Sequence, residues 1–245
     1  MKRTVSIVTV TLNACEDLRQ TLASVHSQTY SPIEHVVIDG CSVDGTLDLI
    51  KKQDGAVDKW LSENDTGPYD AMNKGLDMAS GEYVWFLNAG DTIAADDTLE
   101  QVMADAEDAD IVYGNAERVD ENGYCRPWHK STPKTSDVSA KSFATGMVIC
   151  HQALLVRRTM APHFNVRWTV CADIDWAIRC LNRTTSVRNV DSLICKFLDG
   201  GISSKYRMKG LIERFDILRG HFGLRKTLKG QMNNLVDLVR RGRWD

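Results

Sequence analysis

The chain has 245 residues, of which 43% are hydrophobic and 26% are charged, and its formal net charge at pH 7 is −3. These values fit one large globular domain with a buried core, and no apolar run approaches the roughly 20 residues of a bilayer-spanning helix. The seven cysteines form no CxxC pair and no Cys/His metal spacing. Their odd number and their scatter through apolar segments indicate reduced thiols in a cytosolic protein and not a disulfide framework.

Residues 1–12 join positive charge to a short apolar stretch and so imitate a signal peptide. The stretch is interrupted by Ser6, Thr9 and Thr11, and its β-branched residues suit a buried strand. We therefore expect a first strand here and a cytoplasmic protein.

The first half of the chain alternates between apolar and amphipathic segments. Apolar runs predict strands at residues 5–11, 34–39, 59–62, 82–87 and 111–113, and helical spacing predicts helices at residues 14–27, 46–53, 69–79 and 97–106. This alternation is typical of βαβ units, so the fold class is α/β with a mostly parallel sheet flanked by helices. The second half has no comparable period, and its architecture is not predicted beyond a helix near Asp173 and Asp175.

The strand at 82–87 runs directly into Asn88, Ala89, Gly90 and Asp91. In open α/β sheets ligands bind at the carboxyl ends of the strands. A carboxylate held there can bind a divalent cation, Mn²⁺ or Mg²⁺, against a diphosphate, because hard cations prefer oxygen ligands. The alternative is a polar turn without a ligand.

A second polar cluster follows the strand at 34–39. Asp39 and Asp44, beside Thr11 and Asn13, would form a crevice rich in acceptors, which suits the imide N–H and ribose hydroxyls of a nucleotide. Capping of the turn is the alternative role for Asp39. The glycine fingerprint GxGxxG is absent, which argues against an NAD-dependent oxidoreductase.

Polar residues are also dense around residues 65–75. Asp65 and Lys74 could reach a bound nucleotide from the side of Asp91, with Lys74 offsetting phosphate charge. A Gly-Pro turn before a solvated helix explains only part of this pattern.

Five segments together resemble the nucleotide-sugar half of family 2 inverting glycosyltransferases of the GT-A fold, namely residues 5–13, 28–30, 37–46, 65–75 and 86–91. The last two are similar to segments of bacterial enzymes that assemble colanic acid, O-antigen and other exopolysaccharides. The resemblance covers nearly all of residues 4–204. It implies a Rossmann-like nucleotide-sugar-binding half over residues 1–91 and an acceptor-binding half over residues 92–204.

The resemblance also implies roles for single residues. Asp39 would recognise the base, and Asp91 would bind the metal that bridges the leaving diphosphate, with Asn88, Ala89 and Gly90 beside the donor. The acidic triplet of the family is incomplete here, because Asn88 and Gly90 occupy two of its positions.

In the second half, Asp173 aligns with the catalytic base of that family, and Ala172 replaces the preceding Glu. His151, Gln152 and Asp175 would lie near the acceptor, and Gly-Gly-Ile-Ser at 200–203 near the diphosphate. For the two aspartates, N-capping of the following helix is the alternative role.

The expected activity is transfer of a single sugar from a UDP- or GDP-linked donor to a hydroxyl of a saccharide or lipid-linked acceptor, in cell-surface polysaccharide biosynthesis. The processive signature QxxRW is absent. A non-catalytic subunit of a membrane assembly is the main alternative. No nucleic-acid partner is expected, and a homo-oligomer stays open.

Residues 205–245 carry a net charge of +7, against −10 for residues 1–204. Apolar residues recur there at spacings of three and four, at Leu211, Ile212, Phe215, Leu218, Phe222, Leu224, Leu228, Met232, Leu235, Val236 and Val239. Cations lie between them at Arg214, Arg219, Arg225, Lys226, Lys229, Arg240, Arg241 and Arg243. The pattern predicts a basic amphipathic helical tail that packs on the sheet or a partner subunit, or lies on the inner leaflet of the cytoplasmic membrane.

Overall fold

The computed structural model describes residues 2–53, 55–120, 122–128, 133, 138–184 and 186–241. The strands are β1 (Val5–Thr11), β2 (Ile33–Asp39), β3 (Lys59–Ser62), β4 (Tyr83–Phe86), β5 (Thr92–Ile93), β6 (Ile111–Val119), β7 (Cys125–Pro127), β8 (Leu154–Arg157) and β9 (Val187–Leu198). The helices are α1 (Cys15–His26), α2 (Thr46–Lys51), α3 (Pro68–Met78), α4 (Thr98–Asp105), α5 (Ala172–Leu181), α6 (Ile202–Lys205), α7 (Arg207–Phe222) and α8 (Leu224–Arg241).

The described strands form one sheet in the order β3-β2-β1-β4-β8-β6-β9-β5, with β7 paired to β6. The pairs among β1 to β4 are parallel, as predicted. The second half is mixed, because β8 is antiparallel to both β4 and β6, whereas β6 and β9 are parallel. The carboxyl ends of β1, β2, β4, β6 and β9 therefore point to the same edge of the sheet.

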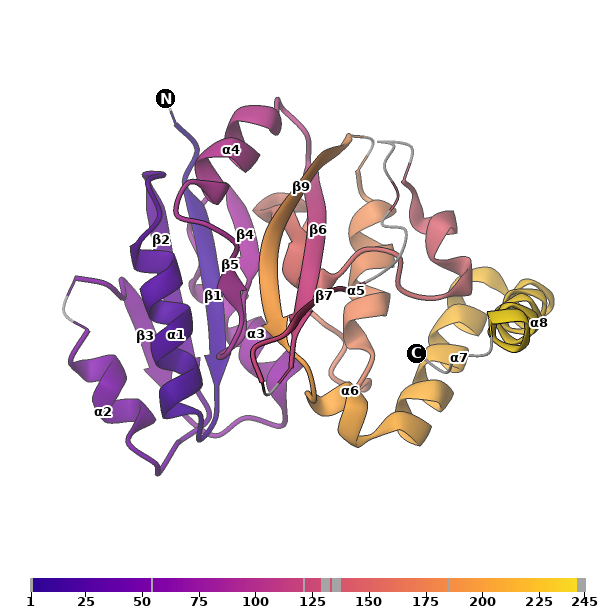
Figure 1. Ribbon diagram of the computed structural model, residues 1–245, viewed down its shortest axis with the longest axis horizontal. Coiled ribbons are helices and arrows are strands. Elements are labelled where there is room, and N and C mark those ends of the chain that lie inside the picture. Colours follow the sequence, from indigo (N-terminus) through magenta and orange to yellow (C-terminus); the bar gives the residue numbers. More distant parts are fainter. Residues whose placement is uncertain are drawn as a thin grey trace.

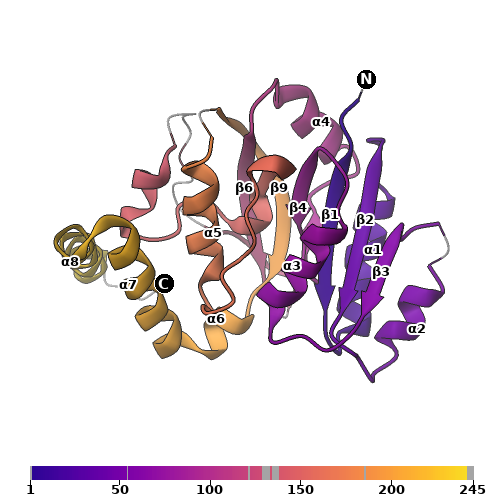
Figure 2. The same ribbon diagram turned by 180° about the vertical axis from the view of Figure 1, so that it is seen from behind.

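Helices cover both faces of this sheet because the strand residues alternate in direction. Helices α1 and α2 lie on one face (Figure 1). There Leu18 of α1 and Ile50 of α2 pack with Val37 of β2. Helices α3 and α5 lie on the other face, which is turned toward the viewer in Figure 2. Each of the predicted helices from α1 to α4 begins and ends within two residues of its expected position.

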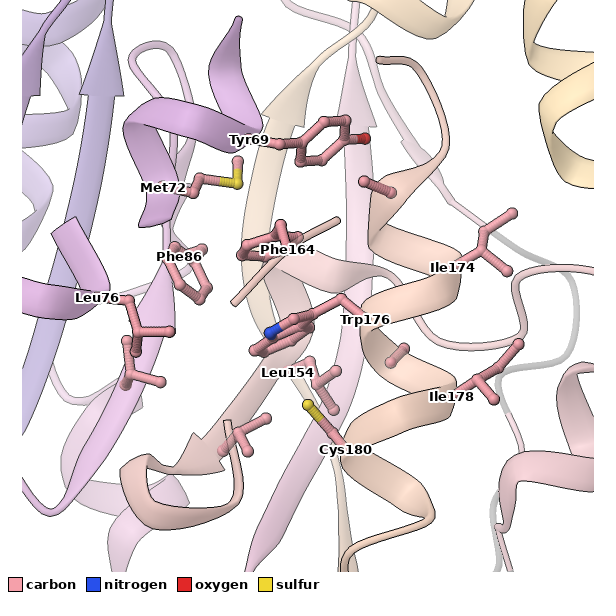
Figure 3. Packing of buried hydrophobic residues seen from close by; sticks show 14 of the residues in the cluster. Tyr69, Met72, Leu76, Phe86, Leu154, Phe164, Ile174, Trp176, Ile178 and Cys180 are labelled. Carbon is pink, nitrogen blue, oxygen red and sulfur yellow. The ribbon is translucent and has the colours of Figure 1, made fainter. Parts of the chain in front are cut away.

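An aromatic cluster joins α3, β4 and α5 (Figure 3). The ring of Phe164 stacks on Trp176 with centroids 4.8 Å apart and on Tyr69 at 5.5 Å, and it meets Phe86 edge-to-face at 5.1 Å. The indole of the fully buried Trp176 donates a hydrogen bond to the carbonyl of Pro162. These contacts fix the start of α3 and the first turns of α5 relative to the sheet.

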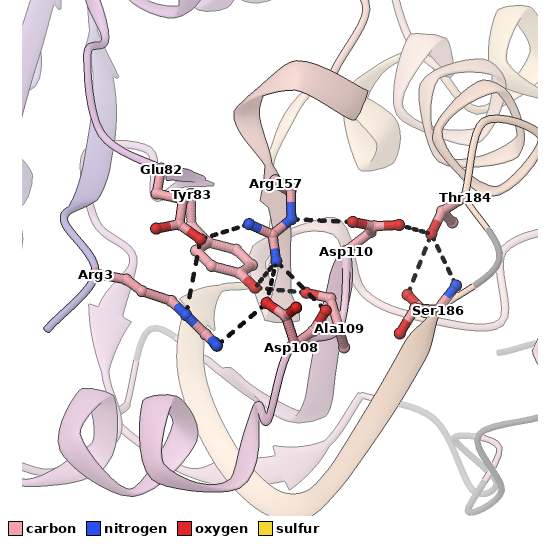
Figure 4. Close-up of polar contacts among 9 residues, drawn as sticks. All are labelled: Arg3, Glu82, Tyr83, Asp108, Ala109, Asp110, Arg157, Thr184 and Ser186. Carbon is pink, nitrogen blue, oxygen red and sulfur yellow. Dashed lines mark hydrogen bonds and ion pairs between the residues drawn. The ribbon is translucent and has the colours of Figure 1, made fainter. Parts of the chain in front are cut away.

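A polar network closes the opposite edge, at the amino ends of β1, β4, β6 and β9 (Figure 4). The guanidinium of Arg157 pairs with Glu82, with Asp108 at 2.9 Å and with Asp110 at 2.9 Å. Asp110 also accepts a hydrogen bond from the Thr184 hydroxyl at 2.7 Å. One arginine thus connects the strands at this edge.

The expected boundary after residue 204 does not separate two hydrophobic cores. Ile217 and Leu218 of α7 are 2% and 0% exposed and belong to the cluster that contains Phe86 and Trp176. Helix α8 lies beyond α7, at the end of the molecule away from β2 and β3 (Figure 1). The tail begins as an integral part of the domain, and Arg243 lies outside the described residues.

Candidate functional site

Three polar side chains stand side by side where the first strands end. The strand register places Thr11 opposite Asp39, and Asp39 opposite Ser62. The carboxylate of Asp39 is 0% exposed and accepts hydrogen bonds from the Ser62 hydroxyl at 2.6 Å and the Ser42 backbone N–H at 3.2 Å. The buried Thr11 hydroxyl has no hydrogen-bond partner among the described residues.

Asn13 and Asp44 connect the two loops that follow β1 and β2. The Asn13 side-chain carbonyl accepts a hydrogen bond from the N–H of Val43 at 2.9 Å. The Asp44 carboxylate accepts from Thr46 and from the N–H of Cys15 at 3.1 Å, and the Thr46 hydroxyl holds the pKa of Asp44 below its usual value. Both residues therefore join these loops, and their side-chain oxygens accept hydrogen bonds within the protein.

Asp65 and Lys74 lie on the segment that leads into and through α3. Asp65 accepts a hydrogen bond from the Gly67 N–H at 2.9 Å, and its other oxygen would lie 2.7 Å from a Cβ at Gly40, a contact that only glycine avoids. The Lys74 ammonium donates to the Asn64 carbonyl at 2.7 Å and pairs with Glu63. Neither residue lines the cleft described next.

A cleft of about 220 Å³ opens at the carboxyl edge of the sheet, between α3, α5 and the end of β9. It brings together these residues named from the sequence: Asn88, His151, Gln152, Asp173, Gly200, Gly201 and Ser203. Other lining residues were not predicted, among them Tyr69, Trp128, Met147 and Asp199. Of these, only Tyr69 has a local signal, because it is an aromatic residue in a polar segment at the start of a helix.

Asp173 is held from two sides within this cleft. Its carboxylate oxygens lie 3.5 Å from Nδ1 of His151 and 3.4 Å from the Tyr69 hydroxyl, which donates to the Val170 carbonyl at 2.9 Å. The Asp173 side chain is 20% exposed. Asp173 lies in the first turn of α5 and is not its N-cap. The N-cap is Cys171, whose side chain makes no capping hydrogen bond.

His151 lies in the wall of the cleft, and its side chain is 16% exposed. Burial alone would lower its pKa, but the hydrogen bond and the charge of Asp173 outweigh burial and raise the pKa. With Nδ1 facing Asp173, the buried Nε2 has no partner among the described residues.

Asp91 lies beneath the cleft and is only 5% exposed. It accepts a hydrogen bond from the Asn88 N–H at 2.9 Å, and burial raises its pKa to about 7, against the opposing influence of His151. Ala89 and Gly90 complete this turn, in which the Ala89 N–H donates to the carbonyl of Val10. The side-chain oxygen of Asn88 is buried in the cleft wall without a partner among the described residues.

Asp175 lies outside the cleft. Its carboxylate is 7% exposed and contacts Arg179 at 2.7 Å and Nε2 of His221 at 2.7 Å. The structure thus gives Asp175 an ion-paired position between α5 and α7 instead of the expected contact with an acceptor.

Two absences among the described residues bear on metal and membrane binding. No group of three or more His, Cys, Asp or Glu side chains there is arranged to hold a metal ion. Among the same residues, no helix is long and apolar enough to cross a bilayer.

The sequence of this chain is similar to those of known glycosyltransferases. The family described as Glycosyl transferase family 2 matches residues 6–163. The PGL/p-HBAD biosynthesis glycosyltransferase of Mycobacterium bovis BCG is 33% identical over 221 residues, which cover 85% of this chain and 82% of that protein.

Two solved structures share the fold. S. aureus TarS 1–349 in complex with UDP-GlcNAc matches with a TM-score of 0.69 and 18% identity, over 89% of this chain and 71% of that one. The mannosyltransferase PcManGT from Pyrobaculum calidifontis, in complex with GDP-Man and Mn²⁺, matches with a TM-score of 0.62 and 18% identity, over 100% of this chain and 77% of that one.

Proposed function

This chain belongs to glycosyl transferase family 2 and has the GT-A fold, and we propose that it is an inverting transferase that moves one sugar from a nucleoside-diphosphate sugar to an acceptor hydroxyl. The observation that carries the proposal is the position of Asp173. Its partly exposed carboxylate lines the same cleft as Asn88 of the turn after β4, at the edge of the sheet where ligands bind.

In the proposed reaction Asp173 acts as the general base. The acceptor hydroxyl gives its proton to the carboxylate while its oxygen bonds to the anomeric carbon, and the bond from that carbon to the diphosphate oxygen breaks on the opposite face. A positioned base contributes about 10²–10⁴-fold. His151 and Tyr69 contact the two carboxylate oxygens and thus restrict the side chain to one orientation.

The donor nucleotide is proposed to bind along the ends of β1 and β2. Thr11, whose hydroxyl has no hydrogen-bond partner among the described residues, and the buried Asp39 lie at these strand ends beside the Asn13 and Asp44 loops, which supports this placement. TarS and PcManGT are described in complex with UDP-GlcNAc and GDP-Man, which supports a UDP- or GDP-linked donor for this chain.

A divalent cation, Mn²⁺ or Mg²⁺, fits the unpaired lone pairs of the cleft. The Asn88 side-chain oxygen and Nε2 of His151 are both buried without a hydrogen-bond partner in the part of the chain that the structure describes, and both suit such an ion. The Asp91 carboxylate accepts a hydrogen bond from the Asn88 backbone N–H and so fixes the turn that carries Asn88. When bound, the cation would offset the charge of the leaving diphosphate, whose oxygens would complete its ligands.

The acceptor is proposed to be a saccharide, carried on a lipid, in cell-surface polysaccharide biosynthesis. Support comes from the outer surface of α7 and α8, where six apolar side chains are 47–72% exposed: Met208, Leu211, Ile212, Leu224, Leu228 and Met232. Exposed cations lie among them at Lys205, Arg207, Lys209, Arg219, Arg225, Lys226 and Lys229. Attraction to anionic lipid is about 1 kcal/mol per Lys or Arg near the surface, so this face suits reversible binding to the inner leaflet.

The proposal is tested with the full-length protein in two steps. Thermal shift with UDP and GDP, with and without Mn²⁺, identifies the nucleotide, and slow hydrolysis of UDP-N-acetylglucosamine, UDP-glucose and GDP-mannose then reports turnover. We expect one donor to be hydrolysed, with activity lost in Asp173→Asn. Asp77→Asn, which removes a 65% exposed carboxylate of α3 outside the cleft, is the matched control. Nucleotide binding without any turnover or transfer would instead favour a non-catalytic subunit.

A further inference from the structure

Helix α7 contacts the segment that leads into the catalytic helix α5. Glu213 of α7 is 6% exposed, and its carboxylate accepts four hydrogen bonds from residues 169–171. One oxygen accepts from the N–H and the hydroxyl of Thr169, both at 3.1 Å. The other accepts from the N–H of Val170 at 2.8 Å and of Cys171 at 3.1 Å.

These N–H groups precede the first turn of α5 and have no partner within that helix. Burial alone would raise the pKa of Glu213, but the three backbone N–H groups outweigh burial and hold the pKa below its usual value. The carboxylate therefore stays ionised at neutral pH and lies at the positive end of the α5 dipole.

Other contacts along α7 involve the same segment. The Cys171 thiol donates to the carbonyl of Gly210 at 3.3 Å, and a Cβ at Gly210 would lie only 3.2 Å from the side chain of Val170. Two residues after the proposed base, Asp175 contacts Nε2 of His221 at 2.7 Å. Helix α7 thus contacts this segment both before and after Asp173.

We propose that Glu213 is a positioning residue that sets the place of Asp173 by fixing the backbone of residues 169–171 from α7. This inference rests on the role of Asp173 in the proposed function. The four hydrogen bonds from residues 169–171 to Glu213 are called the clamp below. The Val170 carbonyl accepts a hydrogen bond from the Tyr69 hydroxyl, which also contacts Asp173. Tyr69 therefore connects the clamped segment to the proposed base. A displacement of about 1 Å at a catalytic group can cost about 10²-fold in rate.

Glu213→Gln tests this inference because it keeps the size of the side chain and replaces one acceptor oxygen with an N–H₂ donor, which breaks the bonds to one side of the clamp. We expect kcat for hydrolysis of UDP-N-acetylglucosamine, or of GDP-mannose if that is the better donor, to fall at least about tenfold. The KM for the donor and the affinity for UDP or GDP should stay within about twofold, because the nucleotide crevice lies on β1 and β2. The stoichiometry of nucleotide binding gives the fraction of intact protein, to which kcat is normalised.

Asp216→Asn is the matched control. It removes a carboxylate from the same helix, where Asp216 pairs only with the neighbouring Arg219 among the ion pairs of the described residues, at 3.1 Å. Its kcat should equal that of the wild type. A kcat of Glu213→Gln within twofold of that of the wild type would overturn the inference. The inference would also fail if the loss of activity disappeared once kcat is normalised to the fraction of protein that binds nucleotide.

Amide hydrogen exchange gives a second readout that does not require the variant to fold. In the wild type, the amides of residues 169–171 should exchange as slowly as those inside α5, whereas exchange as fast as at the exposed Gly201 would overturn the clamp. If the wild type hydrolyses and transfers no nucleotide sugar, the proposed function fails, and exchange alone still decides whether Glu213 fixes this segment.

Discussion

Glu34→Gln should destabilise the protein without changing nucleotide binding. The Glu34 carboxylate lies near the amino ends of β1 and β2 and is 11% exposed. It pairs with the Lys59 ammonium at 2.6 Å and accepts hydrogen bonds from Ser6 and from both the N–H and the hydroxyl of Ser80. Its removal therefore perturbs the edge of the sheet opposite the cleft.

The size of the effect follows from the pKa of Glu34. Burial alone would raise this pKa, but Lys59, Ser6 and Ser80 lower it from 4.5 to about 2. At about 1.4 kcal/mol per pH unit, the ionised carboxylate contributes about 3 kcal/mol to the free energy of unfolding. Because the folded pKa is depressed, this contribution is fully present above pH 4.5 and is lost as the pH falls toward about 2.

Urea denaturation of the wild type and of Glu34→Gln between pH 7 and pH 3 measures the contribution of the Glu34 carboxylate to the free energy of unfolding. Thermal denaturation under the same conditions gives the change in Tm. At pH 7 the variant should be about 3 kcal/mol less stable, with Tm lower by roughly 6–12 °C, and the difference should shrink to about half or less by pH 3. Glu16→Gln, at a 75% exposed side chain on α1, is the matched control and should change stability by less than about 0.5 kcal/mol. A difference below about 1 kcal/mol, or one independent of pH, would refute this reasoning.

Three further predictions concern the site and the tail. Asp173→Asn should keep nucleotide affinity and lower transfer by about 10²-fold or more, and transfer equal to the wild type would remove Asp173 from its role. Asp91→Ala should weaken donor binding as much as chelation by EDTA does, since Asp91 holds the backbone of Asn88, and undiminished turnover in excess EDTA would contradict a required cation. The full-length chain should float with anionic vesicles at low salt and detach at high salt, because salt screens the attraction. Charge reversal at Lys226 and Lys229 should weaken that binding, and a wild type that stays in the soluble fraction at low salt would leave the tail with a structural role.

The first half of the fold could be predicted because most residues of β1, β2 and β4 are apolar and because polar residues follow each of the parallel strands. For β1 to β4 this local pattern fixes both the element and the edge at which its polar end lies. The grouping of Thr11 with Asp39 followed from that pattern alone.

The second half depends on contacts between distant segments. In β9 most side chains are only half-buried, so the strand has no clear apolar period, and β8 has four residues in an antiparallel position. His151 and Asp173 are 22 positions apart in the sequence but meet in the cleft. No local pattern reveals such a pair.

Asp175 and the tail illustrate the same limit. An aspartate at the start of a helix has a local explanation as a cap, whereas its partner His221 lies 46 positions later. The charge of residues 205–245 indicated a separate unit, but burial of Leu218 and Glu213 depends on the surface that the rest of the domain presents to α7.

The most direct test of the central proposal is a proton NMR time course of nucleotide-sugar hydrolysis by the wild-type protein with Mn²⁺. We expect release of the nucleoside diphosphate together with a free sugar whose anomeric configuration is first opposite to that of the donor, and loss of this activity in Asp173→Asn. Retention of the donor configuration in the first-formed sugar, or equal activity of Asp173→Asn and wild type, would contradict the proposal.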